Sequence, residues 1–409
     1  MTNLLTQNPT TFDYRNEFFR LSTIEQTEQK GIQVFALRDE SIDISYIELL
    51  FFKGKLDGFS TAISTYLSDL FTHLISAEGH PLFEEIEFRG ARTSIEIGAT
   101  TTSLKVYALK EHLPHLYTQI VQLLVKPQIK ESSFQLVKEN IFKDIETEKL
   151  QKESKLSEVS STYFYADSEL RKQLTSEDVN LVELHSLLTA FQSLLTSLNS
   201  VFSVNVDYVD LSVFQSETQK RPITLQQKTK QVLLYPKLNT EQSLLHNTHF
   251  SCKLNDPKYA DYYFFNQVYG GSFQSVLSQE IREKQGLTYG IHSSLMSFGE
   301  QSVLKVKSTT PYQKAIKVQE EIVNIQLGFE RFLDEQYIED LKKTATVTFL
   351  RSMESVFSQL NLHRNIYLKN LAPTFYGDLL EGLKKCTIDD LLSVNKELQT
   401  QPSLRIIVE

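Results

Sequence analysis

The order of predicted strands and helices in the first half of the chain occurs again in the second half. Each half begins with strands, continues through a helical stretch and a hairpin, and ends with long helices and a closing strand. Two short matches mark the repeat: Leu104-Lys105-Val106 against Leu304-Lys305-Val306, and the helix start at Thr175 against that at Thr387. Strands and helices in separate runs are typical of α+β domains. The sequence therefore predicts two repeated α+β domains, each an antiparallel sheet with helices packed on it.

The chain has 409 residues, which is too many for one hydrophobic core. A polar segment with a single proline, residues 214–230, separates the two repeats and is predicted to be a linker. The predicted domains are residues 1–213 and residues 231–409. Each includes one long predicted helix after its hairpin, from Ser132 to about Ala166 in the first domain and from Asp334 to about Leu368 in the second.

Composition excludes several classes of function. The formal net charge is −9, which argues against a nucleic-acid-binding protein, because such proteins carry basic surfaces. The two cysteines, Cys252 and Cys386, form no Cys-x-x-Cys motif, so a thiolate metal site or redox site is not expected. The N-terminal segment lacks an apolar run of signal-peptide length, and no run is long enough to span a membrane. We therefore expect a cytoplasmic protein with no nucleic-acid or membrane partner.

The stretch from Val268 to Ser293 has the most distinctive local pattern. Two glycines precede a predicted amphipathic helix, and Gly286 ends that helix because glycine readily adopts positive φ. The apolar face of the helix is predicted to comprise Phe273, Val276, Leu277 and Ile281. Leu287, Tyr289 and Ile291 then alternate as in a strand. Arg282 and Tyr289 project from these adjacent elements, and their guanidinium and phenol donors are suited to a peptide carbonyl or a carboxylate.

This stretch resembles the signature of the insulinase (pitrilysin-like) zinc metallopeptidase family, in which a Gly-Gly-small-aromatic turn precedes Arg-Glu-Lys and Gly-Leu-x-Tyr. In that family the Arg and the Tyr bind substrate and stabilise the transition state. The resemblance puts these roles on Arg282 and Tyr289, and a substrate-binding role on Gly270, Gly271, Ser272 and Phe273. It also implies that the two domains form a clamp around a chamber.

The zinc motif of that family is missing. The family binds zinc through an inverted His-x-x-Glu-His on a helix of the first domain. The matching stretch here, residues 58–70, has Thr61, Ser64 and Thr65 at the motif positions, and no shift of register gives two histidines and a glutamate. Glu139 and Glu146, on the helix that would supply the distal ligand, are then predicted to be solvated charges. We expect this chain to bind no metal.

Some members of the family are heterodimers, in which one subunit has the zinc motif and the other supplies the Arg and the Tyr. The resemblance predicts that this chain is the substrate-binding subunit, inactive alone, with zinc held by a paralogous peptidase subunit and a peptide as substrate. One alternative is a structural scaffold, and another is a peptide-holding clamp with no catalytic role. A third is an active peptidase with an unfamiliar metal site around His73, Glu78 and His80, although this spacing does not put all three on one helical face.

Overall fold

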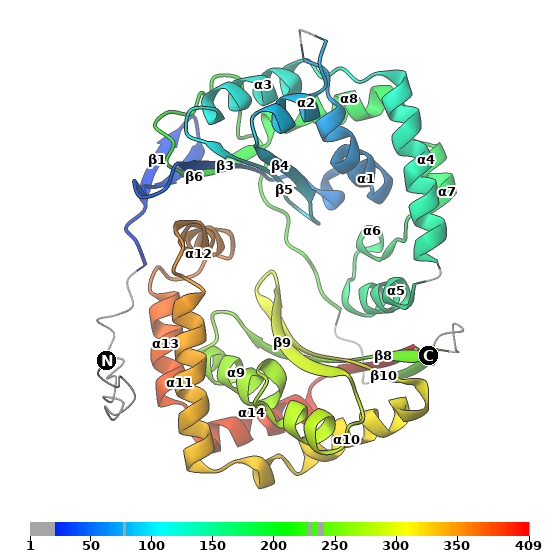
Figure 1. Ribbon diagram of the computed structural model, residues 1–409, viewed down its shortest axis with the longest axis vertical. Helices are drawn as coiled ribbons and strands as arrows, with labels where there is room; N and C mark the ends of the chain where they lie inside the picture. The colour runs from blue at the N-terminus through cyan, green and yellow to red at the C-terminus, as the bar shows by residue number, and fades with distance from the viewer. Residues whose placement is uncertain (1–20, 77–78, 150, 227–230, 236–240, 409) are drawn as a thin grey trace, which may run out of the picture.

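The computed structural model describes residues 21–76, 79–149, 151–226, 231–235 and 241–408. It contains two sheets, one in each half of the chain, which share the order of five strands, and the first sheet has β1 as an additional edge strand (Figure 1). The first sheet runs β1 (Glu25–Gln29), β2 (Ile32–Leu37), β6 (Leu198–Val204), β3 (Ile44–Phe51), β5 (Thr102–Leu109) and β4 (Arg92–Ile97). The second runs β7 (Gln231–Tyr235), β11 (Ser403–Val408), β8 (Gln242–Lys253), β10 (Gln301–Pro311) and β9 (Gly290–Phe298). The prediction of two repeated α+β domains is confirmed. One pair in each sheet is parallel, β2 with β6 and β7 with β11, and the others are antiparallel.

Helices cover the outer face of each sheet (Figure 1). On the first sheet they are α1 (Thr61–Leu70), α2 (Leu82–Phe88), α3 (Leu113–Val125), α4 (Glu131–Glu148), α7 (Ser176–Asn180) and α8 (Leu184–Gln192). On the second they are α9 (Tyr259–Asn266), α10 (Ala315–Leu327), α11 (Glu335–Arg351), α13 (Phe375–Lys385) and α14 (Ile388–Thr400). Alternation along the strands builds each core, since Leu104 and Val106 are buried beneath the first set and Leu304 and Val306 beneath the second.

The repeated helix starts have the same cap. Thr175 Oγ1 accepts a hydrogen bond from the Asp178 backbone N–H, and the Asp178 carboxylate accepts one from the Thr175 N–H. Thr387 and Asp390 make the same reciprocal pair at the start of α14. A capping box satisfies two backbone donors that a helix start otherwise leaves unpaired. These helix starts are confirmed, and the cap marks corresponding positions in the two halves.

The prediction of one long helix after each hairpin is wrong. In the first half α4 ends at Glu148 and a separate helix, α5 (Lys152–Phe164), follows it. In the second half α11 ends at Arg351, and α12 (Val356–Leu368) begins behind a new cap, in which Ser355 Oγ accepts a hydrogen bond from the Ser358 N–H at 3.1 Å. Neither break contains a glycine or a proline, and for that reason the sequence pattern suggested a single helix.

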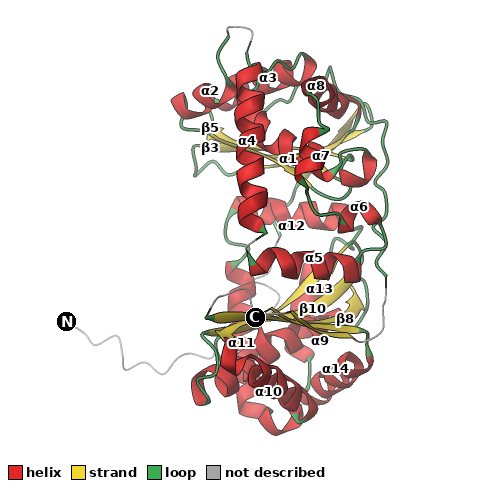
Figure 2. Cartoon of the chain, turned by 90° about the vertical axis from the view of Figure 1, so that its right-hand side faces the viewer, coloured by secondary structure: helices red, strands yellow, loops and turns green. Residues whose placement is uncertain are grey.

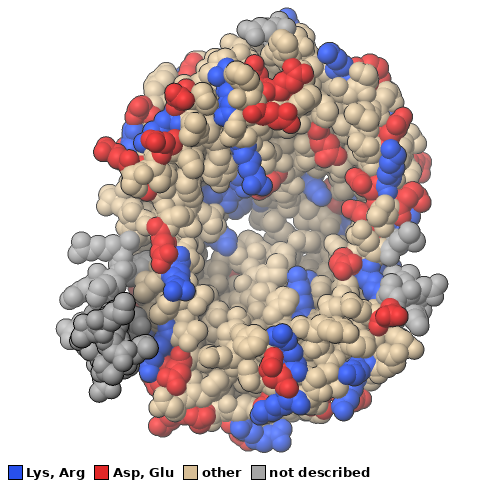
Figure 3. Space-filling view, in the orientation of Figure 1, with Lys and Arg blue, Asp and Glu red and all other residues tan. Residues whose placement is uncertain are grey.

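Each of these second helices packs on the sheet of the other half. Leu156 and Phe164 of α5 lie in one cluster with Phe250 of β8 and several residues of β11. Leu360 of α12 lies in a cluster with residues of β2 and β6, among them Phe202. Figure 2 shows α5 and α12 between the two sheets, and Figure 3 shows the hollow that remains between the halves. The two halves therefore form a clamp in which each half supplies a helix to the inner face of the other.

A short helix, α6 (Ser168–Arg171), follows α5.

We keep the division into residues 1–213, 214–230 and 231–409 as a proposal. Phe214 is fully buried in the core of the first half, and residues 227–230 of the proposed linker lie outside the described part of the chain. Within that described part, no helix has both the length and the apolar character needed to cross a lipid bilayer.

A buried ion pair fixes α12 on the first sheet. Glu48 of β3 is 2% exposed, and its carboxylate accepts a hydrogen bond from Arg364 Nε of α12 at 2.8 Å. The hydroxyls of Ser103 and Tyr46 donate to the same carboxylate. Burial, and then the neighbouring Glu48 charge, raise the pKa of the Tyr46 phenol, which therefore stays a donor. A charge buried this deeply depends on its partner from the other half of the chain.

Replacement of Arg364 should therefore weaken the whole structure. In Arg364→Ala the Glu48 carboxylate stays buried without its cation, and we expect the free energy of unfolding to fall by roughly 3–5 kcal/mol. Urea denaturation at pH 7 measures this loss. The matched control is Arg38→Ala, which breaks an exposed pair with Asp207 and should cost less than about 1 kcal/mol. Equal losses in the two variants would contradict a structural role for the buried pair.

Candidate functional site

The two glycines of the distinctive stretch are explained by close packing. After α9 the chain widens into a π-helical turn, η5 (Gln267–Gly271), which lies against β9. A Cβ atom at Gly270 would lie 2.7 Å from Ser293 Oγ, and one at Gly271 would lie 2.7 Å from Asn266 Nδ2. The Ser293 hydroxyl also donates to Asn266 Oδ1 at 2.7 Å, which ties the strand to the end of α9. Only glycine allows the backbone this close to β9.

The next segment exposes one residue that was expected in the core. Val276, Leu277 and Ile281 are buried beside the second π-helical segment, η6 (Ser278–Lys284), as predicted. Phe273 is 64% exposed, so its predicted place on the same apolar face is wrong. The physical reason is that residues 272–275 form a turn, and helical periodicity starts only after it.

Phe273 and Arg282 lie together on the surface. The Arg282 guanidinium carbon is 5.1 Å from the centre of the Phe273 ring, a cation–π contact. Arg282 Nε is 3.6 Å from a Glu283 carboxylate oxygen, and the Arg282 side chain is 39% exposed. Ser272, between Gly271 and Phe273, donates its hydroxyl to the Gln267 carbonyl at 3.2 Å. Most of the guanidinium donors of Arg282 are therefore open to a ligand.

Tyr289 is directed outward by an irregular turn. Gly286 has φ of +58°, as expected of the glycine that ends the preceding helix. Leu287 and Ile291 are buried, but Tyr289 is 67% exposed, so the predicted alternation is wrong for Tyr289. The strand β9 begins only at Gly290, and before it Thr288 Oγ1 donates to the Thr309 carbonyl at 2.6 Å. This inward hydroxyl leaves the next side chain, Tyr289, pointing away from the core.

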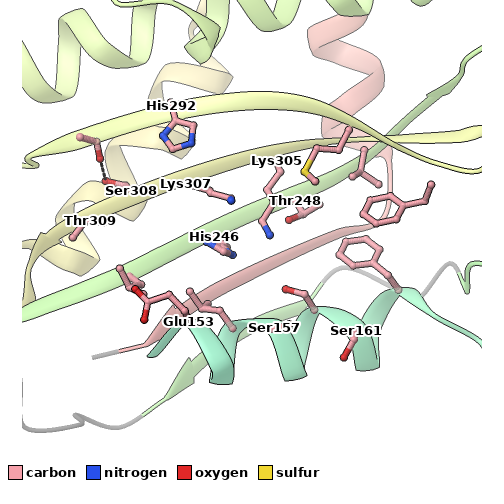
Figure 4. Close-up of a pocket in the computed structure, with 18 of the residues that line it drawn as sticks. Glu153, Ser157, Ser161, His246, Thr248, His292, Lys305, Lys307, Ser308 and Thr309 are labelled. Carbon is pink, nitrogen blue, oxygen red and sulfur yellow. Dashed lines mark hydrogen bonds between the residues drawn. The ribbon is translucent and has the colours of Figure 1, made fainter. Parts of the chain in front are cut away.

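The Tyr289 side chain lines a cavity of about 740 Å³ on the inner face of the second sheet. Figure 4 shows the cavity between α5 and the strands β8, β9 and β10. Its polar lining includes Glu153, His246, Thr248, His292, Lys305 and Lys307, and its apolar lining includes Leu156, Phe164, Met296, Phe298 and Val303. The cavity was not predicted from the sequence, because one wall, α5, comes from the other half of the chain. The alternation of Lys305, Lys307 and Thr309 on one strand face was the available signal.

Burial makes this cavity unfavourable for positive charge. The pKa of His246 is lowered to about 3, first by burial and then by Lys305, Lys307 and His292. Burial and then Lys307 lower the pKa of Lys305 to about 8, and burial and Lys307 also lower the pKa of His292. At neutral pH both imidazoles are therefore uncharged, and the positive charge of the cavity lies on the two lysines.

The helix that matches the zinc motif does not offer a zinc site. Ser64 of α1 donates its hydroxyl to the Phe59 carbonyl at 3.0 Å, and Thr65 donates to the Thr61 carbonyl at 3.0 Å. Zinc in proteins is bound by imidazole, thiolate and carboxylate groups, so these hydroxyls do not fit the metal. Glu139 and Glu146 of α4 are exposed to solvent, as predicted for solvated charges.

The alternative site around His73, Glu78 and His80 is not assembled by the described residues. His80 Nδ1 lies 3.1 Å from a Glu84 carboxylate oxygen, and the His73 ring packs edge-on against Phe83. Glu78 lies outside the described residues. The one group of three potential metal ligands found in the described part of the chain is Asp261, Cys386 and Asp390. Asp261 is on α9, Asp390 is on α14 and Cys386 caps the end of α13, so the group lies among the outer helices, away from the cavity.

Comparison with known proteins identifies relatives of this arrangement. A family model described as the peptidase M16 inactive domain matches residues 178–344. No curated protein matches the sequence significantly. Among solved structures, the peptidase M16 inactive domain from Pseudomonas fluorescens matches with a TM-score of 0.78 at 15% identity, over 95% of this chain and 98% of that chain.

Two other solved structures are similar. A protease from Helicobacter pylori has a TM-score of 0.80 at 13% identity, over 95% of this chain and 99% of that chain. The ferredoxin protease FusC, as a variant in complex with Arabidopsis ferredoxin, has a TM-score of 0.74 at 13% identity, over 94% of this chain and 44% of that chain. At these identities the similarity is one of fold.

The close approach at Gly270 can be tested by adding one carbon. In Gly270→Ala the new Cβ meets Ser293, and we expect a loss of roughly 1–3 kcal/mol in the free energy of unfolding. Gly290→Ala is the matched control, since a Cβ there meets nothing within 4 Å. Thermal unfolding of both variants decides the matter, and an unchanged melting temperature for Gly270→Ala would disprove the packing argument.

The lowered pKa of His246 predicts a specific pH dependence. Between pH 6.5 and about 3 the unfolded chain protonates this imidazole but the folded chain does not, so its contribution to stability falls as the pH drops through this window. We expect His246→Gln to lose less stability than the wild type between pH 6.5 and pH 4.5 in urea denaturation. His185→Gln, at an exposed site, is the control. Identical pH profiles for wild type and His246→Gln would contradict the prediction.

Proposed function

We propose that this chain is the substrate-binding subunit of a heterodimeric zinc metallopeptidase. Its fold resembles that of the insulinase-like (M16) peptidases, and residues 178–344 match their inactive domain. The chain is a peptidase-family protein of the non-catalytic type. In this proposal it binds a peptide inside its clamp and adds Arg282 and Tyr289 to the active site of a zinc-bearing paralogue.

The observation that carries the proposal is the exposure of Tyr289 at the wall of a large cavity. Its neighbours Leu287 and Ile291 are buried, but the Tyr289 ring is 67% exposed. The described residues give its hydroxyl no hydrogen-bond partner. An apolar ring held in solvent with a free donor is typical of a binding surface, because burial would otherwise stabilise it. The fold relative FusC was solved with a protein ligand, ferredoxin, which supports a binding role for such a clamp.

Each of the two side chains has a separate task in the proposed complex. The guanidinium of Arg282, already placed by its contact with Phe273, presents a planar fork of donors to a carbonyl or carboxylate of the peptide. The Tyr289 hydroxyl donates a hydrogen bond to the oxygen on which negative charge develops during hydrolysis. Because α1 of this chain presents hydroxyls where zinc ligands would be required, the metal belongs to the partner subunit.

Removal of the Tyr289 hydroxyl tests this role. Tyr289→Phe keeps the ring, so assembly with the partner should be intact, but turnover of the mixed complex should fall by about 10²–10³. Tyr208→Phe is the matched control, since Tyr208 is also strongly exposed but lies in the first half. The measurements are turnover of a quenched peptide library and complex formation by sedimentation. Normal turnover in Tyr289→Phe would mean that the signature marks the fold alone.

A companion pair of variants tests Arg282. Arg282→Lys keeps the charge and loses the fork, so the mixed complex should bind peptide more weakly. Arg331→Lys is its control, because Arg331 also lies over an aromatic ring, that of Phe332, elsewhere on the surface. Equal turnover of the paralogue with and without this chain would contradict the heterodimer and favour the scaffold or peptide-holding alternatives.

A further inference from the structure

Two cavities of this molecule lie at corresponding places in the two halves. Each lies between the inner face of a sheet and the helix that crosses from the other half, α12 in the first half and α5 in the second. The strand positions that line them correspond one to one. In the smaller cavity they are Tyr46, Glu48, Lys105 and Tyr107, and in the larger one they are His246, Thr248, Lys305 and Lys307. The helix positions also correspond, so the two linings can be compared residue by residue.

The cavity of the first half is small and its charges are matched. Glu48 lies opposite Lys105 across the β3/β5 pair and accepts a hydrogen bond from Arg364 of α12. Lys105 Nζ in turn lies 2.7 Å from a carboxylate oxygen of Glu96 on β4. The remaining space is about 250 Å³. In this half the cationic side chains Arg364 and Lys105 are therefore paired with carboxylates of the chain itself, those of Glu48 and Glu96.

The cavity of the second half retains the lysine and loses both acids. Lys305 takes the place of Lys105, but Thr248 lies opposite it on β8 where the first half has Glu48. Met296 of β9 takes the position of Glu96. The cavity is also larger, about 740 Å³.

Further differences add cationic and unpaired polar groups. Lys307 replaces a tyrosine, and neither the Lys305 nor the Lys307 side chain has an ion pair or hydrogen bond with any described residue. Glu153, from the first turn of α5, is the one acid among the lining residues (Figure 4). Ser160 Oγ and His246 Nδ1 are buried without a hydrogen-bond partner among the described residues. Buried polar atoms of this kind are normally satisfied, by protein, water or a ligand.

We propose that the cavity between α5 and strands β8 to β10 is a carboxylate-binding subsite for peptides. Lys305 and Lys307 hold the carboxylate, which comes from an acidic side chain or from a peptide C-terminus. The peptide thus supplies the group that Glu48 supplies in the first half. The apolar walls formed by Leu156, Phe164 and Val303 contact the rest of the peptide. A small inorganic anion would leave these walls without a contact. The proposal concerns binding by this chain itself and does not rest on a partner subunit.

The direct test is the affinity of the full chain for matched labelled peptides. Three hexapeptides of alanine and leucine are compared by fluorescence anisotropy: one with a single glutamate and an amidated C-terminus, one with glutamine and a free C-terminus, and one with glutamine and an amide. Loss of a hydrogen bond to a charged group weakens binding by about 10–100-fold. We expect the fully neutral peptide to bind at least about tenfold more weakly than the better of the other two, which identifies the source of the carboxylate. Equal affinity for all three would overturn the proposal.

Variants of the two lysines locate the site. Lys305→Met and Lys307→Met should each reduce the preference for the charged peptide, and Lys305→Met should fold normally because burial disfavours the lysine charge. Lys317→Met, at an exposed position on α10, is the control and should keep the preference. Thr248→Glu restores the carboxylate of the first half and should block the charged peptide. An unchanged preference in both lysine variants, or competition by inorganic phosphate as effective as by the charged peptide, would refute a peptide carboxylate site.

Discussion

The exchange of helices between the two halves is the interaction on which the rest of this structure depends. A sheet with apolar residues on both faces needs cover on both, and the outer helices cover only one. Phe250 on the second sheet is covered by α5, and Phe202 on the first by α12, each from the opposite half. The halves are therefore held facing each other by burial of apolar surface, reinforced by the Glu48–Arg364 pair. The hollow between them follows from this arrangement.

The same exchange of helices places different side chains at corresponding positions on the inner faces of the two sheets. In the first half the crossing helix brings Arg364 to Glu48, and the cavity between helix and sheet is small and its charges are paired. In the second half the crossing helix brings Ser160 to the corresponding place, and the space stays open around Lys305. Two repeats with one fold thus contain a small cavity with paired charges in the first half and a larger cationic cavity in the second. The difference comes from a few side chains on two strands and one helix.

The signature segment combines packing and exposure within a few residues. Gly270 is needed because its backbone packs against Ser293 with no room for a Cβ atom, and this contact fixes the start of β9. The fixed turn then directs Tyr289 into the hollow and leaves Arg282 at the surface beside Phe273. Donors for a peptide are present, and the helix in the zinc-motif position offers only hydroxyls bonded to its own backbone. The proposed role as a binding subunit rests on this combination.

The sequence by itself determined those features that depend on neighbouring residues: the repeated strands, the capping boxes at Thr175 and Thr387, and the helix end at Gly286. Each depends on a local backbone preference that acts wherever the chain lies. Tertiary structure alone decided which sheet α5 and α12 pack on, and that Tyr289 leaves the face of its neighbours. It alone brought α5 to Lys305, because that contact joins residues from different halves of the chain. No local pattern encodes such a contact, since periodicity gives the buried face of a helix and not the sheet that buries it.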